Sequence, residues 1–452
     1  MNKSLTIKLI SPRMSLRPMD SGMKRQMAPP LSLVTIASMT PKQHTVYVED
    51  ENIGKVNFND NPDLIGITVT VDTAWRAFEI SRIYKARGKK VIFGGIHASA
   101  CPQEMLAHCD SVCIGEAENL WSQIIDDCER NSLKPLYYNA EPTDLSLVPI
   151  ADWGFVRKKS RYLYHNIVVT SRGCPFKCEF CYNSCDYVNH KYRNRPVDDI
   201  VKEIENIGTK QIMFIDDNFI GNTGWTEMLL DKTADMGLVW HAAVSTNLVH
   251  YPDLIAKMAK SGCRSLFIGF ESINTDAVKS VNKKQNKISE YEKLIQLLHN
   301  NGIMVNASLV FGFDSDTPET FEETLKWLVK NKIETMTGHI LTPYPGTVLY
   351  KKLEKEGRII CQDLEKYNTS HVVFRPAHLS PEQLQAGYLK MYKEFYSLRN
   401  ILKRRPQNRQ IIVSYFLFNL GYRKYGRFIS FIGRLGLMNA IGKLARRLSY
   451  GI

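Results

Sequence analysis

Three cysteines lie close together in the stretch TSRGCPFKCEFCYNS, residues 170–184. Cys174, Cys178 and Cys181 follow the spacing C-x3-C-x2-C. Thiolates on so short a loop can converge on one soft metal centre. The spacing therefore predicts a metal site built on this loop, and the alternatives are a zinc site or scattered core cysteines.

The number of thiols separates these alternatives. A structural zinc site closes its shell with four ligands, usually as two C-x2-C pairs, and no clear second pair is present. An iron–sulfur cube takes one thiolate for each iron, so three cysteines would leave one iron open to a substrate or cofactor. Cys185 is the open alternative, because as a fourth ligand it would close that position.

The elements around the loop alternate between strand and helix. Short apolar runs separated by helical patterns predict a parallel sheet covered by helices. We expect strands at residues 165–171, 211–217, 240–246, 265–272, 304–313 and 335–343, and helices near 196–207, 224–236, 251–261, 274–280, 287–301, 317–331 and 346–356. Six such units predict a partial (β/α)6 barrel, in which chemistry gathers at the carboxyl ends of the strands. The cysteine loop follows the first strand at that end.

With Phe180 before the last cysteine, the motif C-x3-C-x-aromatic-C resembles the radical S-adenosylmethionine (radical SAM) superfamily over residues ~160–375. The resemblance implies a [4Fe-4S] cluster held by Cys174, Cys178 and Cys181, whose open iron binds the amino and carboxylate groups of S-adenosylmethionine. It also implies that one electron cleaves the sulfonium to a 5′-deoxyadenosyl radical, which abstracts hydrogen from an unactivated carbon. In such enzymes the cofactor carries the hard chemistry and the protein orients it.

The same resemblance implies where S-adenosylmethionine binds. Phe180 would lie against the adenine, and backbone at Gly312 would approach the same ring. Asp216 and Asp217 stand where many members have Gly-Gly-Glu, which leaves open which acid binds the amino group. The complete set of expected contacts is Phe180, Asp216, Asp217, Ser245, Asn247, Glu271 and Gly312. Each could instead be a turn or cap residue.

The first part of the chain has its own alternation of strands and helices. Strand-like runs occur at residues 5–10, 45–50, 63–71, 89–96 and 111–117, with helical segments at 30–39, 73–87, 102–108 and 117–130. This pattern predicts an α/β, doubly wound (Rossmann-like) domain. Small and hydroxyl residues end several of these strands, which suits a ligand laid across the carboxyl edge of the sheet.

Followed by a radical SAM domain, this region resembles the cobalamin-binding domain of cobalamin-dependent radical SAM enzymes, the class of the hopanoid methylases and the bacteriochlorophyll ring cyclase. The implied cobalamin contacts are Thr68, Thr70, Gly94, Gly95, His97, Gly115 and Glu116. The Asp-x-His-x-x-Gly motif that supplies a cobalt ligand in many cobalamin proteins is absent, and His97 is the nearest candidate. The alternative is a degenerate domain kept for packing.

We expect a cobalamin-binding domain at 1–140, a linker at 141–158, a radical SAM barrel at 159–375 and a helical, basic region at 376–452. Of the net charge of +13, eleven positive charges and no acidic residue lie in 401–452. Basic segments with interleaved apolar residues bind anionic membranes, and clustered Lys and Arg also bind nucleic acid. A solvated basic helical face is the third interpretation.

The first residues show no secretory signal pattern, and no apolar stretch is long enough for a confident membrane span. We expect a cytoplasmic protein with peripheral contact to a membrane surface, and thiols in a reducing compartment.

The function expected from the resemblance is cobalamin-dependent C-methylation of an unactivated carbon on an apolar, lipid-like small molecule. A donor such as flavodoxin or ferredoxin would reduce the cluster. The alternatives are ring formation or rearrangement without methyl transfer, RNA modification, and an iron–sulfur electron carrier or sensor.

Overall fold

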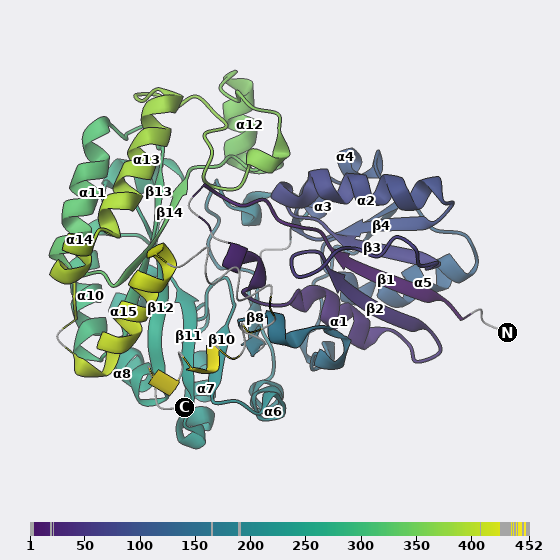
Figure 1. The fold of residues 1–452 in the computed structure, drawn as a ribbon, viewed down its shortest axis with the longest axis horizontal. Coiled ribbons are helices and arrows are strands. Elements are labelled where there is room, and N and C mark those ends of the chain that lie inside the picture. Colours follow the sequence, from purple (N-terminus) through teal and green to yellow (C-terminus); the bar gives the residue numbers. More distant parts are fainter. Residues whose placement is uncertain are drawn as a thin grey trace.

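The computed structural model describes residues 4–18, 20, 22–163, 166–188, 191–406 and 408–424, together with 435, 437, 440, 442–444 and 447–448. Two six-stranded parallel sheets dominate these residues and lie in two domains side by side (Figure 1). The predicted α/β class, with a Rossmann-like domain, a partial barrel and a helical C-terminal part, is confirmed.

The first sheet has the strand order β2-β1-β3-β4-β5-β6. Its strands are β1 (Thr6–Ser11), β2 (Thr45–Asp50), β3 (Leu64–Thr68), β4 (Lys90–Gly94), β5 (Ser111–Ile114) and β6 (Leu136–Tyr138). Because β1 pairs with both β2 and β3, the direction in which strands are added reverses between β1 and β3. Ligands of doubly wound sheets bind at the carboxyl edge beside such a switch point.

Helices cover both faces of this sheet, which explains why its strands are apolar on both sides. They are α1 (Leu31–Met39), α2 (Ala74–Ala86), α3 (Ile96–Ala100), α4 (Pro102–Leu106) and α5 (Trp121–Glu129). One hydrophobic cluster joins the sheet to α2 and α4, and a second joins it to α1 and α5.

The second sheet has the order β14-β13-β12-β11-β10-β7, so each strand is added beside its predecessor. The strands are β7 (Ile167–Val168), β10 (Gln211–Phe214), β11 (Val239–Val244), β12 (Cys263–Glu271), β13 (Met304–Phe311) and β14 (Thr335–Ile340). The helices between and after them are α6 (Val197–Ile207), α7 (Thr223–Thr233), α8 (Pro252–Lys260), α9 (Thr275–Ser280), α10 (Tyr291–Asn300), α11 (Pro318–Lys330) and α12 (Val348–Lys355). This is an open (β/α)6 barrel with one large hydrophobic core.

The C-terminal helices pack on the barrel. They are α13 (Pro381–Phe395), α14 (Leu398–Lys403) and α15 (Arg409–Lys424). Ser380 caps α13 through a hydrogen bond from Gln383 N, as the Ser-Pro sequence predicts. Tyr388, Tyr392 and other residues of α13 belong to the barrel core. Most of the basic segment beyond residue 424 lies outside the described residues.

Arg404 is one of the basic residues of 401–452, yet its side chain is fully buried. Its guanidinium donates hydrogen bonds to the carbonyl oxygens of Ile333, Glu334 and Phe395. This cation therefore joins α14 to the barrel and is not part of a solvated basic face. Among the described residues, no helix is both long enough and apolar enough to cross a bilayer.

Candidate active site

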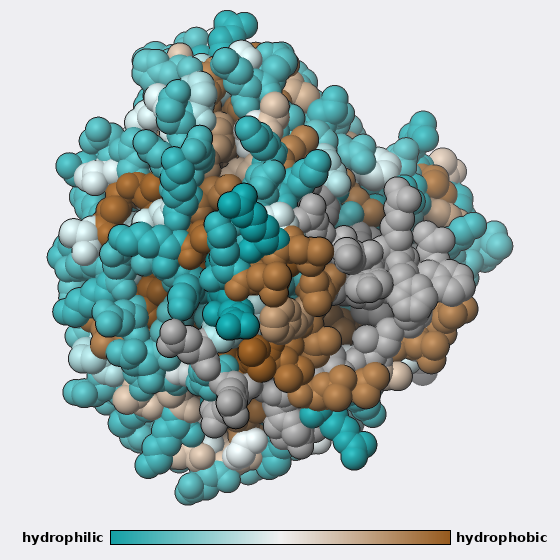
Figure 2. Space-filling view, turned by 60° about the vertical axis from the view of Figure 1, so that its left-hand side comes forward, coloured by the Kyte–Doolittle hydropathy of each residue, from teal (hydrophilic) through white to brown (hydrophobic). Residues whose placement is uncertain are grey.

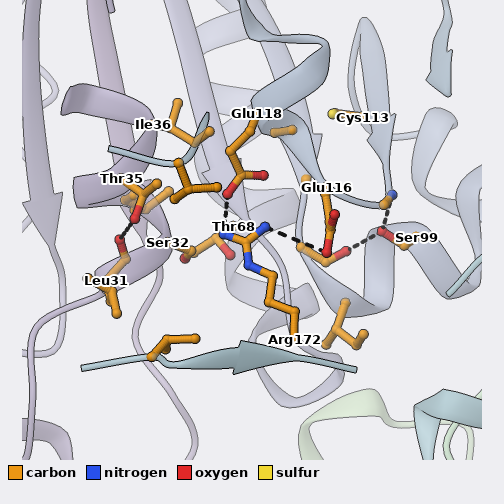
Figure 3. Close-up of a pocket in the computed structure, with 18 of the residues that line it drawn as sticks. Leu31, Ser32, Thr35, Ile36, Thr68, Ser99, Cys113, Glu116, Glu118 and Arg172 are labelled. Carbon is orange, nitrogen blue, oxygen red and sulfur yellow. Dashed lines mark hydrogen bonds and ion pairs between the residues drawn. The ribbon is translucent and has the colours of Figure 1, made fainter. Parts of the chain in front are cut away.

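A cavity of about 690 Å³ lies between the two domains, at the carboxyl edge of the first sheet. The first domain lines it with α1 and the ends of β3, β4 and β5. The second domain contributes the start of the cysteine loop and the residues that follow β10. Figure 3 shows Arg172 from the second domain extending toward Glu116 and Glu118 of the first. The cavity therefore joins the switch point of the first sheet to the cysteine loop.

Glycines form the part of the cavity wall that ends β4 and β5. Gly95 adopts a φ of +97°, and a Cβ there would lie 2.9 Å from both Thr68 Oγ1 and Val69 N. Gly115 has a φ of +80°, and a Cβ there would meet nothing within 4 Å. Ser99 Oγ braces both turns, because it accepts a hydrogen bond from Gly115 N at 2.8 Å and donates to the Gly95 carbonyl at 2.9 Å. At Gly94, Gly95 and Gly115 the wall presents backbone alone, and this glycine cradle fits a broad, flat ligand such as a corrin ring.

Of the residues predicted to contact cobalamin, the structure brings six to the cavity: Thr68, Thr70, Gly94, Gly95, Gly115 and Glu116. His97 is fully buried in α3 and does not line it. Among the described residues, neither ring nitrogen of His97 has a hydrogen-bond partner, and burial lowers its pKa to about 4. Its role as a cobalt ligand stays a prediction.

Glu116 takes part in an ion network that spans the two domains. Its carboxylate lies 2.6 Å from Arg193 Nη2 and 3.6 Å from Arg172 Nη1, and it accepts a hydrogen bond from Thr143 N at 2.9 Å. Arg172 also pairs with Glu118. Burial favours the neutral acid, but these donors and cations prevail and lower the pKa of Glu116 to about 2. We call Glu116, Glu118, Arg172 and Arg193 the interdomain clasp.

The cysteine loop is bracketed by a short antiparallel pair, β8 (Ser171–Arg172) and β9 (Arg193–Asn194). Within it, Cys181 N donates to the Cys178 carbonyl at 3.0 Å. Burial raises the pKa of the Cys181 thiol to about 12, and Asp217, Cys178 and Cys174 add to this shift. The three thiols are thus close enough to interact electrostatically, as ligands of one centre would be.

No group of three His, Cys, Asp or Glu side chains within the described residues surrounds a single point at the distances of one metal ion. A cube places each thiolate on a different iron, which separates the sulfurs more widely than the ligands of one ion.

Cys185 has different surroundings. Burial raises the pKa of its thiol to about 11, and the charges that act on it are Lys351 and Asp186. The Cys185 thiolate in turn raises the pKa of Cys101, a residue of the first domain. None of the other three loop cysteines contributes to its shift. Cys185 therefore interacts electrostatically with Cys101 and shows no such interaction with the group of three.

Asp216 and Asp217 are adjacent but face different partners. Asp216 Oδ1 accepts hydrogen bonds from the backbone amide and hydroxyl of Thr170 and of Ser171, at 2.5–3.0 Å. Burial raises the pKa of Asp216 to about 6 against these bonds. Asp217 lines the cavity, and its charge raises the pKa of both Cys174 and Cys181. The second acid is therefore the one that faces the thiols.

Ser245 and Asn247 form a polar group at the end of β11. Their side chains hydrogen-bond each other, and Ser245 N donates to Asn218 Oδ1 at 3.2 Å. Asn218 Nδ2 is buried and has no partner among the described residues. Asn218, the residue after the two acids, is therefore an orphaned donor.

The other predicted S-adenosylmethionine contacts lie on the barrel side of the loop. Phe180 packs against the cluster that contains Val310 and Phe313. Glu271 ends β12 with a φ of +61° and pairs with Lys283. At Gly312, the space that a Cβ would occupy is filled by Leu384, whose Cδ2 would be 2.8 Å away. The contact of Gly312 with adenine stays a prediction.

Sequence reasoning missed Arg172, Glu118, Lys283 and Gln285. Each acts through a partner distant in the sequence, so no local motif marks them. The only signal available for Arg172 was its place two residues before Cys174.

Comparison with known proteins supports the assignment of both domains, the first as a cobalamin-binding domain and the second as a radical SAM barrel. Residues 168–328 match the radical SAM superfamily, residues 26–125 match the B12 binding domain, and residues 347–414 match a domain of unknown function, DUF4070.

Curated relatives match along most of the chain. The bacteriochlorophyllide d C-12(1)-methyltransferase of Chlorobaculum tepidum is 32% identical over 419 residues, which is 90% of each chain. The hopanoid C-2 methylase of Rhodopseudomonas palustris is 26% identical and covers 83% of this chain and 72% of its own.

Solved structures show the same fold. The radical S-adenosylmethionine methyltransferase TsrM of Kitasatospora setae, with cobalamin and a [4Fe-4S] cluster bound, has a TM-score of 0.68 at 16% identity. It covers 98% of this chain and 100% of its own. The cobalamin-dependent enzyme OxsB has a TM-score of 0.69 and covers 94% of this chain and 72% of its own.

The cofactors of such an enzyme are a [4Fe-4S] cluster, S-adenosylmethionine and cobalamin, and the three-thiol loop, the facing acid and the glycine cradle provide chemically suitable places for them. The chain belongs to the cobalamin-dependent radical SAM enzymes and is a methyltransferase-type member of that family.

Proposed function

We propose that this enzyme methylates an unactivated carbon of an apolar, lipid-like small molecule. The observation that carries the proposal is the cavity between the domains, because it joins the glycine cradle to Asp217 and to the start of the cysteine loop. Relatives named as a bacteriochlorophyllide methyltransferase and a hopanoid methylase support methyl transfer over ring formation.

Within this proposal, Cys174, Cys178 and Cys181 hold the cluster. Asp217 accepts hydrogen bonds from the amino group of S-adenosylmethionine, since it lines the cavity and its charge acts on Cys174 and Cys181. When bound, these cofactors supply hydrogen abstraction from carbon and a methyl group. Phe180, Ser245, Asn247, Glu271 and Gly312 complete the expected S-adenosylmethionine contacts.

The residues around the cavity also favour an apolar substrate. Leu31, Ile36 and Val148 are among the many aliphatic side chains that line it. Burial of such a surface against an apolar molecule contributes about 25 cal/mol of favourable binding free energy per Å² of apolar surface removed from water. Three of the clasp residues, Glu116, Glu118 and Arg172, also line the cavity.

The test is anaerobic reconstitution followed by turnover with S-adenosylmethionine that carries a deuterated methyl group. We expect about four irons per chain, release of 5′-deoxyadenosine on addition of dithionite, and transfer of the labelled methyl group to a component of an apolar cell extract. A loaded enzyme that releases no 5′-deoxyadenosine and labels nothing would refute the proposal. Reduction by flavodoxin or ferredoxin stays a prediction.

An apolar substrate suggests a membrane source, and α15 supplies a surface suited to one. Its buried side carries Ser414, Tyr415 and Asn419, whereas Val413, Leu417 and Phe418 are 40–43% exposed. Figure 2 shows apolar side chains gathered on the face that carries α15. The helix therefore buries Ser414 and Asn419 together with Ile411 and Tyr415, and leaves three apolar side chains on its outer side.

We propose that this face rests on an anionic bilayer, because residues 401–452 carry ten cations besides the buried Arg404, and no acid. Vesicle flotation tests it. Leu417→Glu should reduce flotation with phosphatidylglycerol vesicles, whereas Leu147→Glu, at an exposed leucine remote from α15, should not. Equal flotation of both variants would exclude this surface, and equal flotation with phosphatidylcholine alone would exclude the role of charge.

A further inference from the structure

A segment from the far side of the barrel lies along the cysteine loop. This backing segment, residues 281–286, follows α9. Glu179 N donates a hydrogen bond to the Val281 carbonyl at 3.0 Å, and Asn282 Nδ2 donates to the Lys177 carbonyl at 3.1 Å. The two bonds fix the loop backbone on either side of Cys178.

Gln285 of the backing segment reaches a cluster cysteine directly. Its Nε2 donates to Cys178 Sγ at a distance of 3.9 Å. The segment is held from behind by Asn286, whose amide donates to the carbonyl oxygens of Gly269 at 2.9 Å and Phe270 at 2.8 Å. The N–H···S contact is thus part of a fixed arrangement and not of a loose surface loop.

Lys283 brings a buried positive charge to the same place. Its side chain pairs with Glu271, and its Nζ lies 5.9 Å from the centroid of the Phe180 ring. Both ionic side chains are at most 10% exposed. A Cβ at Gly269 would lie 2.6 Å from Glu271 Oε1 and 2.9 Å from Lys283 Nζ, so the absence of a side chain there makes room for the pair.

The pair reaches the cysteine loop through its positive end. The Lys283 ammonium stands over the ring of Phe180, the residue before Cys181. Lys283 also lies between Asn282 and Gln285, whose side chains donate to the Lys177 carbonyl and to Cys178 Sγ.

Charge and hydrogen bonds near cluster sulfurs set the reduction potential of an iron–sulfur cluster. Each added electron makes the cluster more negative, so a nearby cation and an N–H donor favour the reduced form. Resting on the proposed function, we propose that Lys283 and Gln285 raise the reduction potential of the cluster held by the cysteine loop. They are positioning residues that act through Cys178.

The test is a redox titration of the reconstituted full-length chain, without S-adenosylmethionine, followed by electron paramagnetic resonance. Gln285→Met keeps the size of the side chain and removes the N–H donor. Lys283→Met is combined with Glu271→Gln, because a single change would leave a buried unpaired carboxylate. Lys284→Met is the matched control, since Lys284 is the next residue and its side chain is exposed.

We expect Gln285→Met and the double variant each to reduce the equilibrium constant for one-electron reduction about tenfold, which lowers the potential by ~59 mV. Lys283→Arg should retain the wild-type potential because it keeps the charge, and Lys284→Met should retain it because water screens its charge. If the double variant assembles no cluster, the potential of Gln285→Met decides the question.

Iron content is measured first, because it distinguishes failure of the proposed function from failure of this inference alone. A wild-type chain that binds no cluster would overturn the proposed function and this inference with it. A cluster of normal iron content whose potential is unchanged in Gln285→Met and in any double variant that assembles would overturn this inference alone.

Discussion

Asp216 and Asp217 occupy adjacent positions with different surroundings. Both acids line the cavity. Asp216 holds the turn before the cysteine loop through Thr170 and Ser171, whereas the charge of Asp217 acts on Cys174 and Cys181. All four of these hydrogen bonds end on Oδ1 of Asp216, so a ligand contact at that oxygen would have to replace them, whereas Oδ2 has no partner among the described residues.

Asp217→Asn should therefore weaken S-adenosylmethionine binding about tenfold or more, which is ~1.4 kcal/mol, and leave iron content unchanged. Asp216→Asn should instead lower iron content, because a neutral amide oxygen accepts the hydrogen bonds of Thr170 and Ser171 more weakly than the carboxylate oxygen does. Anaerobic equilibrium dialysis and iron analysis measure the two effects. A weaker affinity with full iron content in Asp216→Asn, and no change in Asp217→Asn, would reverse the assignment.

The cysteines can be separated in the same way. Cys174→Ala, Cys178→Ala and Cys181→Ala should each abolish cleavage of S-adenosylmethionine. Cys185→Ala should leave it largely intact, because that thiol interacts electrostatically with Cys101 and Lys351. Iron content and 5′-deoxyadenosine release are the measurements. Loss of the cluster in Cys185→Ala would show that the assignment of ligands is wrong.

At the scale of elements, the turn after β4 shows how backbone shapes the cavity. Gly95 needs its positive φ, and its neighbours Thr68 and Val69 leave no room for a Cβ. Gly88, after α2, also has a positive φ, of +71°, but a Cβ there meets nothing within 4 Å. Substitution of Gly88 therefore tests backbone strain alone, whereas substitution of Gly95 tests strain together with steric overlap.

Gly88→Ala should destabilise the chain by about 1 kcal/mol through strain alone. Gly95→Ala should cost about 1–3 kcal/mol more, because it also overpacks the turn, and should weaken cobalamin binding. Urea unfolding and the visible spectrum of bound cobalamin are the measurements. Equal effects of the two changes would show that the turn relaxes without cost.

At the scale of the whole molecule, the interdomain clasp joins the two sheets across the cavity. Glu116 contacts Arg193 and Arg172 of the second domain. Its pKa falls from 4.5 in the unfolded chain to about 2 in the folded one. The clasp is therefore fully stabilising above pH ~4.5 and is lost as the pH falls toward 2.

Glu116→Gln should cost about 1–2 kcal/mol of stability at pH 6, after allowance for solvent screening. The difference from wild type should shrink as the pH approaches 3, because the wild-type carboxylate is then partly protonated. Urea midpoints of the apo chain at the two pH values measure this. A difference that does not depend on pH would show that the carboxylate contributes no charge interaction.

The sequence by itself determined the chemistry and the fold class. The C-x3-C-x2-C spacing is local, so it could be read without knowledge of the fold. The alternation of short apolar strands with helices predicted two parallel sheets, and the order of six barrel strands follows from sequential crossovers. The strand β6 was missed because its three residues lie in a stretch with a proline and little apolar pattern.

Only the tertiary structure decided which side chains face one another. It separated Asp216 from Asp217, brought Cys185 within electrostatic range of Cys101, buried His97 away from the cavity, and brought Lys283 and Gln285 to the cysteine loop. These outcomes depend on contacts between residues that are up to 107 positions apart in the chain. Periodicity and spacing report local geometry, whereas packing of distant elements sets the direction of each side chain.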